Sequence, residues 1–210
     1  MAVVDINKST GPDGISNKIV KYCANSLSYP LSIIFRNSLE SGCFPSIWKT
    51  AHVTPIFLKK GTKNCPQNYR PISILSNFSK IFERIISDQL YEYLNSNNLL
   101  NKQNAGFKKG DSATNQLLFL TNKIQSGFEN NMNTAMVFLD IKSAFDRVWH
   151  PGLVFKLSKL GIQGSLLKWM SNYLTNRNQL VVVKGASSSL QTITAGVPQG
   201  SILGPLLFLI

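Results

Sequence analysis

The sequence predicts a mixed α/β (α+β) fold. Three patterns predict it: apolar residues at helical spacing from about 77 to 97, an apolar run at 134–140, and a hairpin pattern at 179–184 and 190–195. The chain has 210 residues, of which 43% are hydrophobic and 15% charged. This length allows the chain a core of its own, and the composition excludes intrinsic disorder for most of it.

The first fifth of the chain is expected to contain a turn and two helices. STGPDGIS (9–16) is a turn cluster, because Gly, Pro and Asp each restrict the backbone. Apolar residues at helical spacing follow from Ile15 to Leu27. Pro30 suits the first turn of a second helix, which Gly42 would end.

The middle of the chain is expected to alternate strand and helix. AHVTPIFL (51–58) is typical of a strand weakened by its proline, and a loop rich in Lys, Asn and Gly covers 59–70. Amphipathic helices should span about 77–97 and 112–129, and the Asp or Ser at the start of the second would cap it.

The last third begins with TAMVFLD (134–140), which is apolar on both faces, as a buried central strand would be. Helices are expected at 151–160 and about 165–174, followed by the hairpin around Gly185. GVPQGSILGPLLFLI (196–210) is typical of a tight turn that enters an apolar helix.

The charge is strongly positive. The 22 Lys and Arg residues against 10 Asp and Glu give a net charge of +12. Such a balance favours a polyanionic partner, nucleic acid first, although a basic solvated surface would give the same count. No carboxylate follows Asp146 in the remaining stretch, 147–210.

The cysteines and histidines do not form a metal-binding pattern. Cys23, Cys43 and Cys65 are widely spaced, and His52 and His150 lie far apart in sequence. We expect free thiols in a reducing compartment. The N-terminus is not that of a signal peptide, and no run of about 18 apolar residues occurs. The expected location is therefore intracellular, in cytoplasm or nucleus, without a membrane span and without secretion.

Asp140 is the first candidate for chemistry. It ends the apolar run, and strand alternation would place it on the same face as Met136 and Phe138. A carboxylate at the mouth of a buried strand is costly unless it binds something, and Mg²⁺ prefers carboxylates together with substrate phosphates. A capping Asp at the following turn explains the same residue equally well.

Five segments resemble the ordered sequence blocks of reverse transcriptases. FLDIKSAFDRVWHPGL (138–153) resembles motif A, and AGVPQGSILGPLLF (195–208) resembles motif B. NYRPISILSNFSKIFERII (68–86), NKQNAGFKKGDSATNQL (101–117) and STGPDGI (9–15) resemble three earlier blocks. Their order and spacing are similar to those of non-LTR (LINE-like, jockey-type) retrotransposon polymerases.

The resemblance implies the fingers and part of the palm of a right-hand polymerase that copies RNA into DNA. Its expected partners are an RNA template, a DNA primer and dNTPs, and its chemistry is nucleotidyl transfer with two Mg²⁺ ions. Asp140 matches the metal ligand of motif A, and Ile141 would add its backbone carbonyl. Asp146 is expected to be a structural hydrogen-bonding group. The fingers would cover about 1–133, motif A 134–150 and motif B 195–210.

The resemblance also implies nucleotide-binding residues. Phe145 matches an aromatic under the sugar of the incoming nucleotide, where a 2′-hydroxyl would clash; an ordinary core aromatic is the alternative. Gln199 and Gly200 match positions that meet the nucleotide and template, whereas a plain helix-entry turn would also use them. Gly200 lets a backbone approach closely.

Two basic residues match positions that contact the triphosphate. Arg70 suits bidentate phosphate contact. Lys59 is the second, although Lys60 and Lys63 are equally available.

Motif C, an apolar residue or two followed by Asp-Asp, is absent through residue 210. We therefore expect the N-terminal part of a reverse transcriptase domain, which alone would be inactive. The alternative is a non-catalytic nucleic-acid-binding fragment or a decayed copy. A group II intron-type maturase is a further possibility within the enzyme class.

Overall fold

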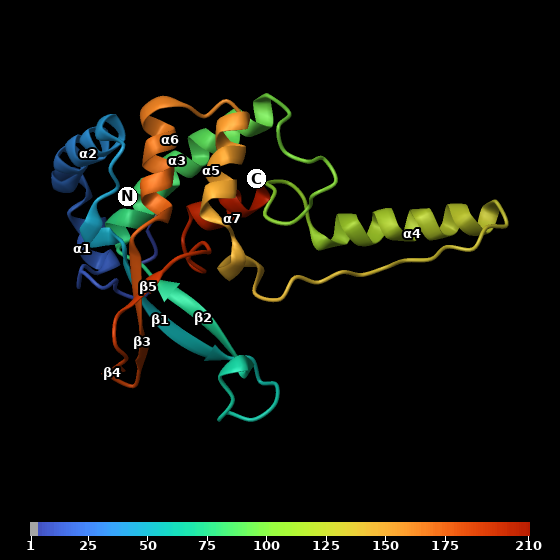
Figure 1. The fold of residues 1–210 in the computed structure, drawn as a ribbon, viewed down its shortest axis with the longest axis horizontal. Coiled ribbons are helices and arrows are strands. Elements are labelled where there is room, and N and C mark those ends of the chain that lie inside the picture. The colour runs from blue at the N-terminus through green and yellow to red at the C-terminus, as the bar shows by residue number, and fades with distance from the viewer. Residues whose placement is uncertain (1–3) are drawn as a thin grey trace.

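The computed structural model describes residues 4–210 and has a helical body from which a twisted sheet and one long helix extend (Figure 1). The α-helices are α1 (Asn17–Tyr22), α2 (Ala24–Ser41), α3 (Asn77–Ser96), α4 (Ala113–Glu129), α5 (His150–Lys159), α6 (Gly164–Leu174) and α7 (Leu203–Leu209). Short 3₁₀ turns are η1 (Ser46–Trp48), η2 (Pro66–Asn68) and η3 (Ala144–Arg147). No helix within residues 4–210 is both long and apolar enough to cross a bilayer. This mixture of helix and sheet agrees with the predicted fold class.

The sheet joins segments from both halves of the chain. Its strands are β1 (Thr50–Phe57), β2 (Tyr69–Ile74), β3 (Arg177–Val183), β4 (Ala186–Ser187) and β5 (Gln191–Ile193). The strand order is β2-β1-β3-β4, with β5 also paired to β3. β1 is antiparallel to β2 and parallel to β3. The predicted strand near 51–58 and the predicted C-terminal hairpin are confirmed, whereas β2 was not predicted.

The core lies between α2, α3, α5, α6 and α7 (Figure 1). Phe82 of α3 is fully buried, stacks on Phe35 of α2 at 4.3 Å between ring centroids, and meets Trp169 of α6 edge-on. Both long amphipathic helices were predicted within a residue or two. Their caps are Ser76 and Ser112, whose hydroxyls accept from backbone N–H groups three residues on.

The prediction that Pro30 opens a helix is wrong. α2 begins at Ala24, directly after α1, so Pro30 lies in its interior. A proline there leaves the carbonyl four residues earlier without its helical donor. That carbonyl belongs to Ser26, which is exposed, so water can satisfy it. Gly42 ends α2 in the left-handed conformation, as predicted.

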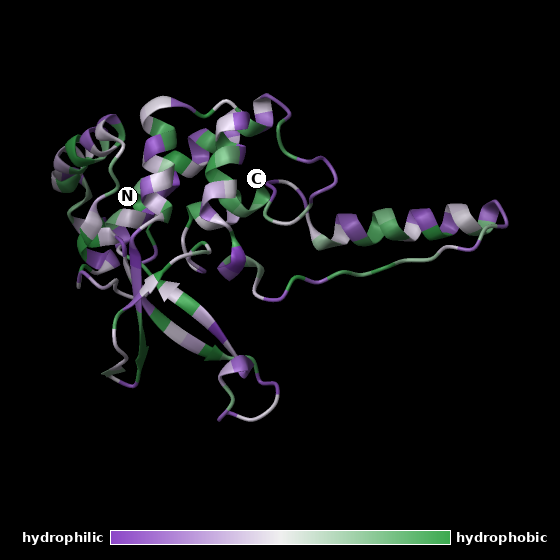
Figure 2. Cartoon of the chain, viewed as in Figure 1, coloured by the Kyte–Doolittle hydropathy of each residue, from purple (hydrophilic) through white to green (hydrophobic). Residues whose placement is uncertain are grey.

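The buried strand predicted at 134–140 is also wrong. After α4 the chain runs back as an extended segment without strand pairing, and much of it is apolar (Figures 1 and 2). Val137, Phe138 and Leu139 are 84%, 80% and 91% exposed. A strand is stabilised by backbone hydrogen bonds to a neighbour, and no described segment between 4 and 210 provides one here. Apolar composition alone therefore does not determine whether a segment forms a buried strand.

Candidate functional site

The turn at Gln199–Gly200 lies directly on β2. The Ser73 N–H donates to the Gln199 carbonyl at 2.7 Å. Gly200 has a φ of 129°, and a β-carbon there would overlap the Ser73 carbonyl oxygen. Only glycine fits this close approach of two backbones. The expected glycine at this turn therefore has a structural cause within the chain itself.

The same turn is held on its other side by the segment that follows Asp140. The Val197 N–H donates to the Phe145 carbonyl at 2.9 Å, and the Gly196 N–H to the Val148 carbonyl at 2.8 Å. The buried His150 has its Nε2 2.7 Å from the Gly196 carbonyl oxygen. These bonds join the motif B segment to the motif A segment.

Asp146 makes a hydrogen bond of the structural kind expected for it. The Gln199 side-chain amide donates to its two carboxylate oxygens, at 3.1 and 3.3 Å. Gln199 is thereby oriented by a residue of the motif A segment, although both side chains remain accessible.

Phe145 is half-buried between aromatic rings. It stacks on Phe208 of α7 at 4.8 Å and meets Phe107 edge-on at 5.6 Å between ring centroids. These contacts are those of a packing residue, and its role toward a sugar stays a prediction.

A cavity of about 300 Å³ lies beside the turn. Its walls come from β2, β3, β5, the turn and the motif A segment, and include Pro71, Ser73, Asp146, Arg177, Thr192 and Gln199. Arg177 is buried and donates from Nη1 to the Tyr173 carbonyl at 3.0 Å. Burial, and then the Arg177 charge, lower the pKa of nearby Lys49. Arg177 therefore gives the wall of this cavity a buried positive charge, and Asp146 gives it an exposed negative one.

The hairpin of β1, β2 and the loop between them carries the predicted triphosphate contacts, Lys59 in the loop and Arg70 in β2. Lys59, Lys60, Lys63 and Arg70 are all exposed, and no carboxylate lies between Phe57 and Arg70. The one ion pair among residues 4–210 joins Lys109 to Asp88, so these four cations have no acidic partner within the described chain. We call Lys59, Lys60, Lys63 and Arg70 the basic hairpin.

Asp140 and Ile141 lie in the extended segment and are exposed. Among residues 4–210 no three His, Cys, Asp or Glu side chains come together as a metal centre would require. One carboxylate and one carbonyl do not make a complete Mg²⁺ site. The described residues therefore do not fit a bound magnesium by themselves.

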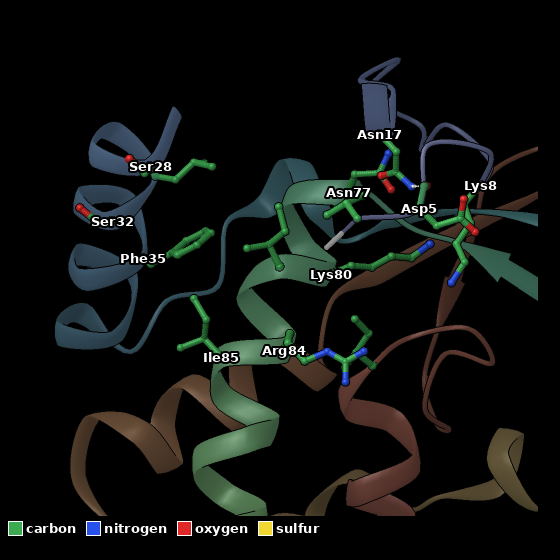
Figure 3. Close-up of a pocket in the computed structure, with 14 residues that line it drawn as sticks. Asp5, Lys8, Asn17, Ser28, Ser32, Phe35, Asn77, Lys80, Arg84 and Ile85 are labelled. Atoms are coloured by element: carbon green, nitrogen blue, oxygen red, sulfur yellow. Dashed lines mark hydrogen bonds between the residues drawn. The ribbon is translucent and has the colours of Figure 1, made fainter. Parts of the chain in front are cut away.

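A larger cavity, of about 760 Å³, is lined by none of the predicted site residues (Figure 3). It opens between α2, α3 and the N-terminal segment, with an apolar floor that includes Phe35 and Ile85. Lys8, Lys80 and Arg84 line it, and burial lowers the pKa of Lys80. No local sequence pattern indicates this cavity, because its walls come from segments far apart in sequence, among them the N-terminal segment, α2, α3 and Ile202.

The five segments with motif resemblance contact one another. Besides the contacts above, Ser76 donates to the Asp13 carboxylate, and the Asn77 side chain donates to the Ile15 carbonyl at 2.8 Å. Phe107 joins the 101–117 segment to motif A through Phe145. Ser73 and Glu83, which hold the motif B segment from β2 and α3, were missed by the sequence reasoning.

Comparison with known proteins supports the same interpretation. Residues 57–210 match the family model described as "Reverse transcriptase (RNA-dependent DNA polymerase)". The chain is 36% identical to the probable RNA-directed DNA polymerase from transposon BS of Drosophila melanogaster, over 97% of this chain and 22% of that protein. It is 35% identical to the RNA-directed DNA polymerase from mobile element jockey of the same species, over 99% of this chain and 23% of that protein.

The chain thus spans about a fifth of the length of these curated relatives. A Pol polyprotein from the R2 element of Popillia japonica is 30% identical over 81% of this chain. The expected similarity to jockey-type non-LTR elements is confirmed. The family match covers well over half of the chain, and on that ground the protein belongs to the reverse transcriptase family.

Proposed function

We propose that this chain forms the fingers and part of the palm of a retrotransposon RNA-directed DNA polymerase. The observation that carries the proposal is the meeting of β2, the 145–150 segment and the Gln199–Gly200 turn at one place. These three segments are far apart in sequence, and each matches a different block of the family. The fingers would be built mainly from about 1–133, and the palm from 134–150 and 195–210.

An RNA template, a DNA primer and dNTPs are the proposed ligands. The basic hairpin offers four cations without acidic partners, which suits phosphate groups. In this proposal Arg70 and Lys59 contact the triphosphate, while Gln199 and Gly200 face the nucleotide and template. The enzyme would act inside the cell.

The proposed metal ligands of this chain are the Asp140 carboxylate and the Ile141 carbonyl. Two Mg²⁺ ions, when bound, would supply charge stabilisation for nucleotidyl transfer. Further carboxylates would have to come from outside residues 4–210, because none of the described ones lies with Asp140 in a cluster. The contribution of this chain is to present Asp140 and to hold the motif B turn.

The test uses a chain extended through motif C. Asp140→Asn should abolish primer extension and leave template binding nearly intact, because the change removes a charge but keeps the shape. Asp146→Asn should be milder, since Asp146 bonds Gln199. Near-normal extension by Asp140→Asn would refute the metal role.

A second candidate is a nucleic-acid-binding module without catalysis. The lack of a carboxylate cluster among residues 4–210 favours it for the chain by itself. Purified residues 1–210 should then bind primer–template without extending the primer in Mg²⁺ and dNTPs. Robust extension by residues 1–210 would exclude this candidate.

A further inference from the structure

Glu83 is the only buried carboxylate among the residues that the structure describes, and its exposed fraction is 0%. It lies on the core-facing side of α3, next to Phe82. A carboxylate in an apolar core is costly unless hydrogen bonds or an opposite charge compensate for lost water. No ion pair compensates Glu83 within residues 4–210. Burial lowers the pKa of Lys80, and Glu83 lies near enough for its charge to oppose that shift. The two side chains form no ion pair, so the direct compensation comes from hydrogen bonds.

Both carboxylate oxygens of Glu83 accept hydrogen bonds. Oε1 accepts from the Ser79 hydroxyl at 2.8 Å, one helical turn earlier in α3. Oε2 accepts from the backbone N–H groups of Ile202 and Leu203, at 2.8 and 3.2 Å. These two N–H groups lie at the start of α7, where a helix leaves donors without partners. A negative charge is favourable at this end of a helix.

The Glu83 contact lies just beyond the Gln199–Gly200 turn. On the near side, Ser73 of β2 holds the turn through its bond to the Gln199 carbonyl. On the far side, Glu83 holds the residues that begin α7. Both anchors belong to the single segment 68–86, which runs from β2 into α3. The turn and the start of α7 are therefore held at two points of one continuous segment.

We propose that Glu83 is a positioning residue, which fixes the Gln199–Gly200 turn by capping α7 from the neighbouring helix. The functional part rests on the proposed function, in which this turn meets template and nucleotide. Glu83 acts through the backbone of Ile202 and Leu203 and touches no substrate.

Amide hydrogen exchange of residues 1–210 tests the proposal without requiring activity. In Glu83→Gln, either the side-chain NH₂ or a neutral and weaker carbonyl acceptor would face the N–H groups of Ile202 and Leu203. The exchange at Ile202, Leu203 and Ser73 should become at least tenfold faster, while amides of the second half of α3 keep their rates. Glu92→Gln is the matched control, because it makes the same charge change at an exposed position of the same helix.

Two results of this experiment would overturn the proposal. Unchanged exchange at Ile202 and Leu203 would show that Glu83 does not hold the turn. Uniformly faster exchange over the whole chain would show a general structural role. If Glu83→Gln fails to fold, Ser79→Ala serves instead, since it removes only the bond to Oε1. It should give the same local pattern with a smaller change, and no local pattern would count against the proposal.

Primer–template affinity of the same samples tests the functional part. Glu83→Gln should weaken binding at least fivefold relative to Glu92→Gln, which carries the same net charge. Equal affinity of the two variants, despite a loosened turn, would overturn the positioning role. Failure of the wild-type chain to bind at all would instead refute the proposed function and leave the exchange result standing.

Discussion

Gly200 lies against the backbone of Ser73, and a β-carbon at position 200 would overlap the Ser73 carbonyl oxygen. This contact joins the motif B turn to β2, across more than a hundred residues of sequence. It explains the glycine by packing, whereas the motif resemblance explains it by access to a ligand. The two explanations predict different effects of substitution on the free chain.

Gly200→Ala should destabilise the free chain, because it adds both the overlap with Ser73 and backbone strain at a φ of 129°. Strain of this kind costs about 1–3 kcal/mol. Urea unfolding measures the loss. Gly185→Ala is the control, since its φ is also positive but its β-carbon would meet open space. An equal loss in both variants would show that the Ser73 contact contributes nothing.

Phe145 offers a choice between packing and sugar selection. Its stacking on Phe208 predicts that Phe145→Val lowers the free energy of unfolding by about 1–4 kcal/mol. Phe119→Val, at a half-exposed position on α4, should change it little. Thermal or urea unfolding of the two variants decides this part.

Sugar selection by Phe145 requires an active chain extended through motif C. There Phe145→Val should admit ribonucleotides far more readily while dNTP use falls less, because the clash with the 2′-hydroxyl is removed. Phe145→Tyr should keep most of the selectivity. Steady-state incorporation of matched dNTP and rNTP pairs measures it. A dNTP/rNTP ratio unchanged in Phe145→Val would reject the sugar role and leave packing.

The burial of Tyr173 predicts that the free energy of unfolding depends on pH. Tyr173 is fully buried, and its hydroxyl makes no well-formed hydrogen bond within residues 4–210, although the Ser201 and Glu83 side chains lie beside it. Burial, reinforced by the Glu83 charge, raises its pKa well above the ordinary 10.0. Above pH 10 the unfolded chain releases this proton and the folded chain keeps it, so the free energy of unfolding should fall with rising pH.

Tyr173→Phe removes this effect. At neutral pH its free energy of unfolding should equal that of the wild type or exceed it by up to about 1–3 kcal/mol, because an unpaired buried hydroxyl is lost. Above pH 10 the variant should lose less stability than the wild type. Tyr22→Phe, at an exposed position, is the control. Parallel pH curves for wild type and Tyr173→Phe would contradict the assignment.

The sequence predicted best what is determined locally. α3 and α4 follow from apolar spacing and from the Ser76 and Ser112 caps, all within a short window. β2 was not predicted, because its six residues include a proline and because its pairing partner, β1, lies beyond a loop. The parallel pairing of β1 with β3 joins residues more than a hundred positions apart. Local patterns carry no information about such pairing.

The site was predicted in part for the same reason. Motif resemblance identified Gln199 and Gly200, but their anchors Ser73 and Glu83 come from a distant segment. A Glu within the apolar stripe of α3 was a signal that could have been used. At 134–140 the apolar run predicted burial, yet burial of a strand depends on a neighbour, and none of the described segments pairs with it.

Salt-dependent binding of primer–template by residues 1–210 tests the central claim most directly. The account predicts that the logarithm of the binding constant falls steeply and linearly with the logarithm of salt concentration. Arg70→Ala should reduce the slope by about 0.7–0.9, which corresponds to the loss of one phosphate contact. Binding should show little preference for nucleotide sequence. Arg36→Ala, at an exposed position on α2 away from the basic hairpin, should leave the slope unchanged. Binding that is absent or independent of salt, or equal slopes for Arg70→Ala and Arg36→Ala, would contradict the account.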